Sequence, residues 1–392
     1  MKKFIPYGRQ FIDHNDIQEA IDVLESDWIT QGPKITEFET SLAHYCGAKY
    51  AVVFNSGTSA LHGAYFALGL QEGDEFITTP ITFVATANAG VYLGAKPIFV
   101  DVEPDTGNID VQKIENNITK KTKLISVVHY AGHPVNLKSI QHIAQKYNLK
   151  IVEDACHALG AEYKASKSGE NWTKIGSCKY SDATVFSFHP VKHITTGEGG
   201  AVLTNNEEVY EKLLLFRNHG ITKNEQKFIG EKHGDWYYEM HFLGYNYRMT
   251  DIQAALGLSQ LKKINAFVKK RREIAQIYNN AFKDNPFFYV PKERDYARSS
   301  FHLYPIRLKE KFINKKKEFF GELRQNGLGV QVHYVPVYYH PFYQSLGYKK
   351  GLCPTAEKFY GQEISLPIFP AMEGEDVKKV IEIVFNVFTT FI

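Results

Sequence analysis

The lysine with the most informative surroundings is Lys192, which lies in a glycine-bounded segment, SFHPVKHITTGEGG, residues 187–200. Upstream, an apolar strand-like run ends in Asp154. A lysine amine and a carboxylate at the mouth of a strand are the two protein groups that pyridoxal phosphate requires, because the amine forms a Schiff base and the carboxylate holds the ring nitrogen protonated. A solvated loop lysine and a helix-capping aspartate are the structural alternatives. Together the two residues predict an enzyme that forms a Schiff base with this cofactor.

Lys192 is expected to serve a second step as well. A carboxylate at Asp154 that faces the pyridine nitrogen favours the charged form of the ring, which then withdraws electrons from the substrate carbon. Once a substrate amine has displaced Lys192, the freed lysine amine lies beside the carbon whose proton must move. Lys192 is therefore predicted to act as the general base.

A phosphate site is predicted where the short apolar strand 50–54 meets a helical pattern through the polar turn NSGTS, residues 55–59. The N-terminus of a helix offers free N–H groups that stabilise an anion. Thr58 and Ser59 supply hydroxyls there, and Ser187, at the end of another strand, is a third candidate. The alternatives are ordinary helix-capping chemistry for the turn and strand termination for Ser187.

One aromatic side chain, Phe83, follows a further strand-like run and the turn TTPIT. An aromatic ring at this place can stack on the flat face of a pyridine ring. A buried core phenylalanine is the alternative, and the sequence leaves both open.

These segments resemble the DegT/DnrJ/StrS family of pyridoxal-phosphate-dependent sugar aminotransferases, and the likeness extends over nearly the whole chain. EDACHALG, residues 153–160, and the stretch 186–200 are most similar to the family members of pseudaminic acid biosynthesis. Those members aminate C4 of a UDP-4-keto-6-deoxy-N-acetylhexosamine with glutamate as the amino donor. The resemblance implies the α/β fold of type I pyridoxal-phosphate-dependent transferases, with a mainly parallel large-domain sheet and a smaller C-terminal α+β domain.

The resemblance also implies which residues contact the cofactor. In chain order they are Thr58, Ser59, Phe83, Asp154, His157, Ser187, Lys192 and Asn246. His157 takes the position beneath the ring, where many relatives carry glutamine. Asn246 reaches across a homodimer interface to the partner's cofactor phosphate, so that each active site is shared between two subunits.

Substrate contacts are implied for an N-terminal residue, for the loop after the first helix and for a segment of the small domain. The expected residues are Tyr7, Ile29, Thr30, Gln31, Gly32, Ser59, Ser187, Asn246, Arg248, Gln331, Val332, His333 and Tyr334. His333 is expected either to hydrogen-bond a sugar or phosphate oxygen or to be satisfied by the backbone at a strand end. The aromatic residues between Tyr334 and Tyr343 are expected either to shape the sugar pocket or to pack between domains.

Length and composition fit this interpretation without proving it. A chain of 392 residues predicts more than one core. The expected parts are an N-terminal segment of the substrate site (1–12), a large cofactor-binding domain (13–262) and a small C-terminal domain (263–392). A formal charge of +3 gives no case for nucleic-acid binding, and the basic run KKRR at 269–272 is interpreted as a solvated helix face.

The four cysteines show no paired metal spacing, and no signal peptide precedes them, so the thiols are expected to be reduced, the protein cytoplasmic and metal ligands absent. The apolar run 380–392 is too short to span a bilayer and predicts a packed amphipathic helix rather than a membrane anchor.

Seven strand-like runs are expected in the large domain, at residues 51–54, 76–78, 98–101, 124–128, 151–154, 184–187 and 201–203. Several are apolar without alternation, as strands covered on both faces are. Helices are expected at 61–68 and 137–147. This order predicts a mainly parallel sheet with ligands at the strand ends.

A first helix is expected from about Asp16, with Asn15 as its cap and Gln18 reaching back to that cap. Its apolar face is expected to carry Ile17, Ile21 and Leu24.

A capping box formed by Thr250 and Gln253 predicts the start of a long helix that runs towards Phe282 and links the two domains. The small domain is expected to contain strands at 301–308 and 329–333. A helix at 314–325, which Gly327 would close, separates them.

Two other functions compete with the aminotransferase. Sugar dehydratases of the same fold replace the Schiff-base lysine by histidine, and here Lys192 is present with His193 beside it. A non-catalytic binding protein of this fold would not need both Lys192 and Asp154.

Overall fold

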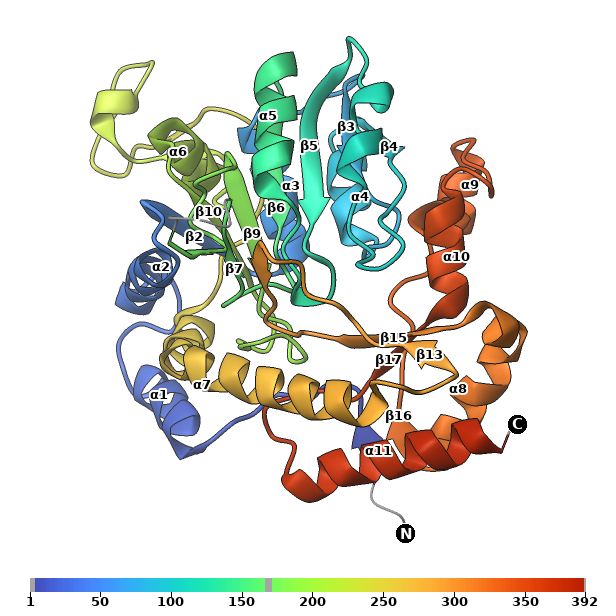
Figure 1. Ribbon diagram of the computed structural model, residues 1–392. Coiled ribbons are helices and arrows are strands. Elements are labelled where there is room, and N and C mark those ends of the chain that lie inside the picture. The colour runs from blue at the N-terminus through green and yellow to red at the C-terminus, as the bar shows by residue number, and fades with distance from the viewer. Residues whose placement is uncertain (1–3, 166–170, 391–392) are drawn as a thin grey trace.

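The computed structural model describes residues 4–165 and 171–390 and has a seven-stranded sheet at its centre (Figure 1). The strands lie in the order β2-β10-β9-β6-β5-β3-β4, and β10 is antiparallel to both neighbours whereas the other pairs are parallel. They are β2 (Tyr50–Phe54), β3 (Glu75–Thr78), β4 (Lys96–Phe99), β5 (Thr122–Val128), β6 (Lys150–Asp154), β9 (Ala183–Ser187) and β10 (Gly200–Thr204). The predicted mainly parallel sheet is confirmed.

All seven predicted strands belong to this sheet, and β4 differs most from its prediction, residues 98–101. It ends at Phe99, because Asp101 has left the ladder to accept hydrogen bonds from the backbone N–H groups of Thr355 and Ala356 at 3.1 and 2.8 Å. Asp101 thereby ties the sheet to the first turn of α10 (Pro354–Gln362).

Helices cover both faces of the sheet, and buried apolar side chains fill the space on each side. They include α2 (Pro33–Cys46), α3 (Gly57–Ala67), α4 (Ala85–Val91), α5 (Leu137–Tyr147) and α6 (Glu207–Phe216). The prediction for α5 is confirmed, whereas α3 begins four residues before the expected Leu61. The reason is a capping box between Ser56 and Ser59, which fixes the helix start directly after β2.

The cap expected for the first helix is wrong by two residues. Helix α1 (His14–Leu24) starts from Asp13, whose carboxylate accepts the backbone N–H of Asp16, while the Asp16 side chain accepts the backbone N–H of Asp13. Asn15 lies inside the helix. An aspartate at both positions completes the reciprocal pair, and Asn15 with Gln18 does not form it.

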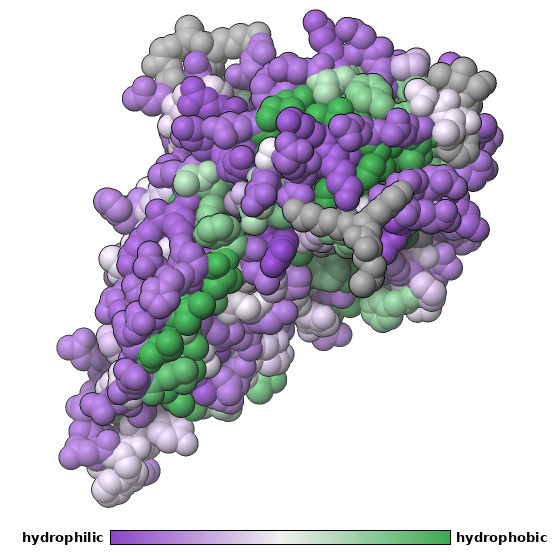
Figure 2. All heavy atoms as spheres, turned by 90° about the horizontal axis from the view of Figure 1, so that it is seen from below, coloured by the Kyte–Doolittle hydropathy of each residue, from purple (hydrophilic) through white to green (hydrophobic). Residues whose placement is uncertain are grey.

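The apolar face of α1 points away from the rest of the chain. Ile17, Ile21 and Leu24 are exposed, with Leu24 at 60%. The buried residues of this helix are instead Val23 and Asp16, and Asp16 accepts a hydrogen bond from Gln260 at 2.8 Å. Figure 2 shows an apolar stripe on the side of the molecule where α1 lies in Figure 1. Polar contacts of Asp16 and the packing of Val23 hold α1 on the chain, and no described residue covers the face with Ile17, Ile21 and Leu24.

The long helix α7 (Asp251–Phe282) spans 32 residues without a break, and the predicted capping box of Thr250 and Gln253 is confirmed. Its first half packs in the core of the large domain, whereas its second half packs in a separate core of C-terminal residues. The helix therefore connects the two cores as one rigid element.

One prediction for α7 is wrong. In the run 269–272, Arg271 is fully buried rather than solvated. Its Nη1 donates to the carbonyl oxygens of Phe301, His302 and Ile368 at 3.3, 3.2 and 2.8 Å. Burial lowers the pKa of Arg271 to about 9. Arg271 is buried because this stretch of α7 has protein on more than one side.

The C-terminal part is built on an antiparallel sheet of β13 (Phe288–Tyr289), β15 (Tyr304–Leu308) and β17 (Glu363–Leu366). Helices α8 (Lys316–Gln325) and α11 (Gly374–Thr389) accompany it. The predicted strand 301–308 begins only at Tyr304, since Phe301 has a left-handed φ of 47°. The predicted strand 329–333 does not extend beyond β16 (Leu328–Gly329), which pairs with β1 (Ile5–Pro6).

Short elements complete the described chain. They are β7 (Glu162–Tyr163), β8 (Thr173–Lys174), β11 (Ile221–Thr222), β12 (Glu239–Met240), β14 (Ala297–Arg298) and α9 (Pro341–Ser345), with short 3-10 turns between them. The predicted C-terminal amphipathic helix is α11, and residues 391–392 of that prediction lie outside the described residues. Within residues 4–165 and 171–390, no helix is long and apolar enough to cross a membrane.

Candidate active site

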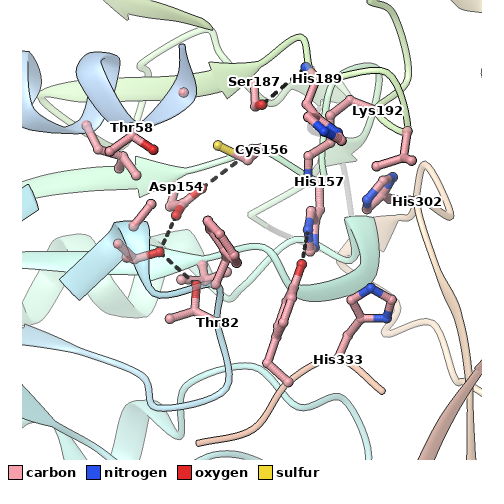
Figure 3. Close-up of a pocket in the computed structure, with 18 of the residues that line it drawn as sticks. Thr58, Thr82, Asp154, Cys156, His157, Ser187, His189, Lys192, His302 and His333 are labelled. Atoms are coloured by element: carbon pink, nitrogen blue, oxygen red, sulfur yellow. Dashed lines mark hydrogen bonds between the residues drawn. The ribbon is translucent and has the colours of Figure 1, made fainter. Parts of the chain in front are cut away.

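A cavity of about 420 Å³ opens at the carboxyl ends of the parallel strands (Figure 3). This is the edge of an α/β sheet at which ligands bind. The predicted site residues that line the cavity are Tyr7, Thr58, Phe83, Asp154, His157, Ser187, Lys192, His333 and Tyr334. Residues from both ends of the chain thus meet at one place.

Lys192 lies in the loop between β9 and β10. The Lys192 backbone N–H donates to the His189 carbonyl at 2.8 Å, and the Thr195 hydroxyl donates to the Phe188 carbonyl at 3.0 Å, so the loop is folded on itself. Burial lowers the pKa of the Lys192 amine. No acidic side chain of the described residues forms an ion pair with it. A larger share of this amine is therefore in the neutral, nucleophilic form than is usual for lysine.

Asp154 ends β6 and is buried at the floor of the cavity. Its Oδ2 accepts the hydroxyl of Thr86 at 2.6 Å, and the Thr86 hydroxyl is 2.7 Å from that of Thr82. Its Oδ1 accepts the backbone N–H of Cys156 at 3.2 Å. An ionised carboxylate only accepts hydrogen bonds, so the hydroxyl protons of Thr82 and Thr86 are directed along the chain towards Asp154. These contacts hold the carboxylate in one orientation.

Neither threonine was predicted as a site residue. The sequence shows only that Thr82 and Thr86 are four residues apart. That spacing does not indicate that they form hydrogen bonds towards Asp154.

Replacing Asp154 by asparagine tests this carboxylate. The Asp154→Asn protein is expected to keep some cofactor but to lose activity by about two orders of magnitude or more, because a neutral amide does not hold a proton on the ring nitrogen. The measurement is the initial rate at saturating cofactor, beside a cofactor titration. Thr82→Val, which removes only the outer hydroxyl, serves as the milder control. Unchanged activity of Asp154→Asn would show that Asp154 has no electronic role.

The N-terminus of α3 faces the same cavity, and Ser56, Gly57 and Thr58 line it. The first N–H groups of a helix have no intrahelical acceptor, and they can bind an anion. A Cβ at Gly57 would lie 2.9 Å from Cβ and 3.2 Å from Oγ of Ser187. The absence of a side chain at Gly57 therefore lets the Ser187 hydroxyl approach the helix start.

Ser59 does not reach this cavity. Its hydroxyl donates within the turn, to Asn55 Oδ1 at 2.7 Å and to the Ser56 carbonyl at 2.9 Å, and it accepts the Ser56 N–H at 3.1 Å. Ser59 shapes the turn that presents Thr58, and its predicted direct contact with phosphate stays a prediction.

A substitution at Gly57 tests the phosphate site. Gly57→Ala is expected to push Ser187 from the helix start and to weaken cofactor binding by roughly tenfold, since one charge-assisted hydrogen bond is worth about 1.5–3 kcal/mol. The dissociation constant is measured by titration of the apoprotein. Gly321→Ala is the matched control, because its Cβ has no atom within 4 Å. Equal weakening in both variants would argue against the assignment.

A group of imidazoles forms the wall next to Lys192 (Figure 3). The ring centroids of His157 and His302 are 4.3 Å apart, and the hydroxyl of Tyr334 lies 3.0 Å from His157 Nε2. Burial holds the pKa values of His157 and His302 well below their usual range and lowers that of His333 to about 3. All three imidazoles are therefore neutral near pH 7. No motif or spacing in the sequence singles out His302.

Phe83 is 58% exposed at the cavity, so the alternative of a core phenylalanine is wrong. Its ring is 6.3 Å from that of Tyr334. Stacking of Phe83 on the cofactor stays a prediction. Among the other aromatic residues after Tyr334, Tyr338 and Tyr343 are buried against Phe99, which is domain packing.

Several predicted substrate residues lie away from this cavity in the single chain. Gln31, Gly32 and Arg248 line a second hollow of about 250 Å³, and Arg248 donates to Asn218 Oδ1 at 2.7 Å. The remaining predicted residues outside the cavity are Ile29, Thr30, Asn246, Gln331 and Val332.

Asn246 is exposed, and its main chain runs beside Asn55, just before the start of α3. Asn55 donates its backbone N–H to the Tyr247 carbonyl at 2.9 Å and its Nδ2 to the Asn246 carbonyl at 3.5 Å. Asn246 therefore lies near the phosphate turn without lining the cavity of its own chain.

Comparison with known proteins agrees with this site. Residues 10–385 match the model of the DegT/DnrJ/EryC1/StrS aminotransferase family. The chain is 47% identical to an uncharacterised protein of Methanocaldococcus jannaschii, over 98% of this chain and 97% of that one. It is 44% identical to a Campylobacter jejuni UDP-4-amino-4,6-dideoxy-N-acetyl-beta-L-altrosamine transaminase, with the same coverage.

Solved structures show the same likeness. Helicobacter pylori PseC, an aminotransferase of pseudaminic acid biosynthesis, superposes with a TM-score of 0.91 at 40% identity and covers 99% of this chain and 100% of that one. The Streptococcus pneumoniae sugar aminotransferase Spr1654 in its PMP form reaches 0.91 at 30% identity, again with 99% and 100% coverage.

The fold and the cavity are those of a pyridoxal-phosphate-dependent aminotransferase. This chain belongs to the DegT/DnrJ/EryC1/StrS family, whose members act on nucleotide sugars. The side chains present fit the cofactor, because an anion site, a buried carboxylate and a lysine of lowered pKa line one cavity.

Proposed function

We propose that this enzyme transfers an amino group from glutamate to C4 of a UDP-4-keto-6-deoxy-N-acetylhexosamine, a reaction of pseudaminic acid biosynthesis. The observation that carries the proposal is the 44% identity to the C. jejuni transaminase over 98% of the chain, together with the lysine and carboxylate in one cavity. A different UDP- or dTDP-linked keto sugar is the alternative substrate.

Bound pyridoxal phosphate supplies an aldehyde that condenses with amines and a ring that withdraws electrons from the substrate carbon. The N-terminus of α3, with Thr58 and Ser187, binds the phosphate. Asp154 holds the proton on the ring nitrogen. Lys192 holds the cofactor between turnovers, and its freed amine moves the proton at the substrate carbon.

The position of His193 argues against a dehydratase. Its Nε2 lies 3.3 Å from the Ser300 carbonyl, and His193 does not line the cavity, whereas Lys192 does. Burial keeps the His193 pKa well below its usual range. The residue that faces a ligand here is the lysine, as an aminotransferase requires.

The working form in this proposal is a homodimer with shared sites. The uncovered face of α1 and a second apolar set support it, since single chains seldom expose such surfaces without a partner. This second set, on the segment between α6 and α7, is Ile229, Trp236, Tyr238, Met240 and Leu243, of which Ile229 is 87% exposed.

A coupled assay with glutamate and a panel of UDP- and dTDP-linked 4-keto-6-deoxy sugars tests the proposal. The product of each reaction is identified by NMR, which gives the aminated carbon and its configuration. The UDP-linked N-acetylhexosamine is expected to have the highest kcat/KM. A higher kcat/KM for a dTDP sugar would support the alternative substrate.

A further inference from the structure

A buried carboxyl group and a buried hydroxyl contact His333, which lines the cavity. Glu363 and Ser365, two residues apart on β17, are both fully buried. The Ser365 Oγ is 2.5 Å from Glu363 Oε1 and 2.9 Å from His333 Nδ1. Glu363 Oε2 accepts the backbone N–H of His333 at 2.8 Å, and the Tyr130 hydroxyl donates to the His333 carbonyl at 2.6 Å. The backbone and one edge of the imidazole are thus fixed.

The directions of these hydrogen bonds follow from the donors available. An ionised Glu363 only accepts, so the single hydroxyl proton of Ser365 goes to the carboxylate. Ser365 Oγ is then an acceptor towards the ring, and His333 Nδ1 must carry the proton. A neutral imidazole has one N–H, so Nε2 of His333 carries no proton and can accept a hydrogen bond.

The charge states agree with this arrangement. Burial raises the pKa of Glu363, whereas the hydrogen bonds from Ser365 and from the His333 N–H and the charge of Lys316 oppose the shift and favour the ionised carboxylate. Burial lowers the pKa of His333 to about 3, so its ring is neutral near pH 8. His333 lines the cavity, and no side chain of the described residues hydrogen-bonds its Nε2.

We infer that Glu363 and Ser365 are positioning residues that present His333 Nε2 to the substrate sugar as a hydrogen-bond acceptor. This inference rests on the proposed function. On a 4-keto-6-deoxy-N-acetylhexosamine ring the donors are the C3 hydroxyl and the acetamido N–H, whereas the keto oxygen and the diphosphate only accept. His333 therefore selects a donor on the sugar and does not bind a phosphate oxygen.

Glu363→Gln is the test substitution, because it keeps the size of the side chain and reverses the chain of hydrogen bonds. The amide oxygen still accepts the His333 backbone N–H, and the amide nitrogen donates to Ser365. The Ser365 hydroxyl then donates to His333 Nδ1, so the proton moves to Nε2. Glu310→Gln, at a surface ion pair with Lys358, is the matched control.

The proton position is read directly from 15N NMR of histidine-labelled holoenzyme at pH 8, since protonated and bare ring nitrogens have distinct shifts. The signal is assigned by its absence in His333→Gln. Wild type and Glu310→Gln are expected to carry the proton on Nδ1, and Glu363→Gln on Nε2. A wild-type proton on Nε2 would overturn the inference. If Glu363→Gln folds poorly, Ser365→Ala replaces it and is expected to lose the Nδ1 preference.

The substrate contact is measured on the same proteins. The KM for the UDP-4-keto sugar is expected to rise roughly tenfold in Glu363→Gln, because a donor would then face the sugar donor. Inhibition by UDP alone should not change. An unchanged KM despite a moved proton would refute the sugar contact. The NMR result does not depend on turnover, so it stands even if no sugar of the panel is aminated and the proposed function fails.

Discussion

Lys192→Ala is expected to lower the rate of transamination by roughly 10³-fold or more, because the substitution removes the covalent anchor of the cofactor and the general base together. The described contacts of Lys192 within its loop are made by the backbone, so the fold and the assembly should persist. The rate is measured with cofactor in excess, and the yellow colour of the lysine–cofactor linkage is expected to be absent.

Two controls accompany this experiment. Circular dichroism and gel filtration of Lys192→Ala should match wild type, which separates loss of chemistry from loss of structure. Lys192→Arg keeps a positive charge in the loop but cannot condense with an aldehyde, and it should be as inactive as the alanine variant. Substantial turnover by either variant would mean that another group carries the reaction.

The central sheet was predictable from the sequence because its strands are buried on both faces. Runs such as 124–128 and 151–154 are apolar at consecutive positions, and that pattern is typical of a parallel sheet covered by helices. The long helix was predictable for a different reason, since Thr250 and Gln253 form a local capping box. Patterns of this kind involve only neighbouring residues, so they can be recognised from the sequence alone.

Burial between distant segments was not predictable in the same way. Arg271 belongs to a basic run that has the pattern of a solvated face, yet the carbonyl groups that it bonds come from residues 301, 302 and 368. The face of α1 with Ile17 and Leu24 has the pattern of a core-facing helix, but it is exposed in the single chain. Periodicity shows that a face is apolar and does not show what covers it.

The same difference between local patterns and distant contacts explains which residues of the candidate site were predicted. Asp154 and Thr58 were found because each stands at the end of an element with a recognisable pattern, and Lys192 was found because it lies in a glycine-bounded loop. His302 and Thr86 were missed, because their importance comes from neighbours that are far along the chain, His157 and Asp154. A family resemblance supplied most of the remaining residues, together with the expectation that Asn246 acts from the partner subunit.

The assignment of Asn246 to the partner's site leads to a second large effect. Asn246→Asp should be inactive, because a carboxylate placed beside the cofactor phosphate repels it and weakens cofactor binding. In the single chain Asn246 is exposed and lies outside the cavity that Lys192 lines, so the phosphate that it meets can belong to either subunit. Activity of the single variant does not distinguish the two cases.

A heterodimer distinguishes them. If Asn246 acts across the interface, a dimer of one Lys192→Ala subunit and one Asn246→Asp subunit has both lesions in one site and none in the other. Such a dimer should show about half of the wild-type activity. If Asn246 acts within its own subunit, each site contains one lesion and the heterodimer stays inactive.

Subunit exchange cannot be assumed, so the two chains are coexpressed with different tags and the heterodimer is isolated by two affinity steps. The controls are the two parental homodimers and a heterodimer of Lys192→Ala with wild type, which retains one intact site whether Asn246 acts across the interface or within its own subunit. Activity near this last control would place Asn246 in the partner's site. It would also make the dimer a condition of catalysis, because a lone subunit would then lack a group that binds its own cofactor. A heterodimer no more active than its parents would show that Asn246 does not act in the partner's site.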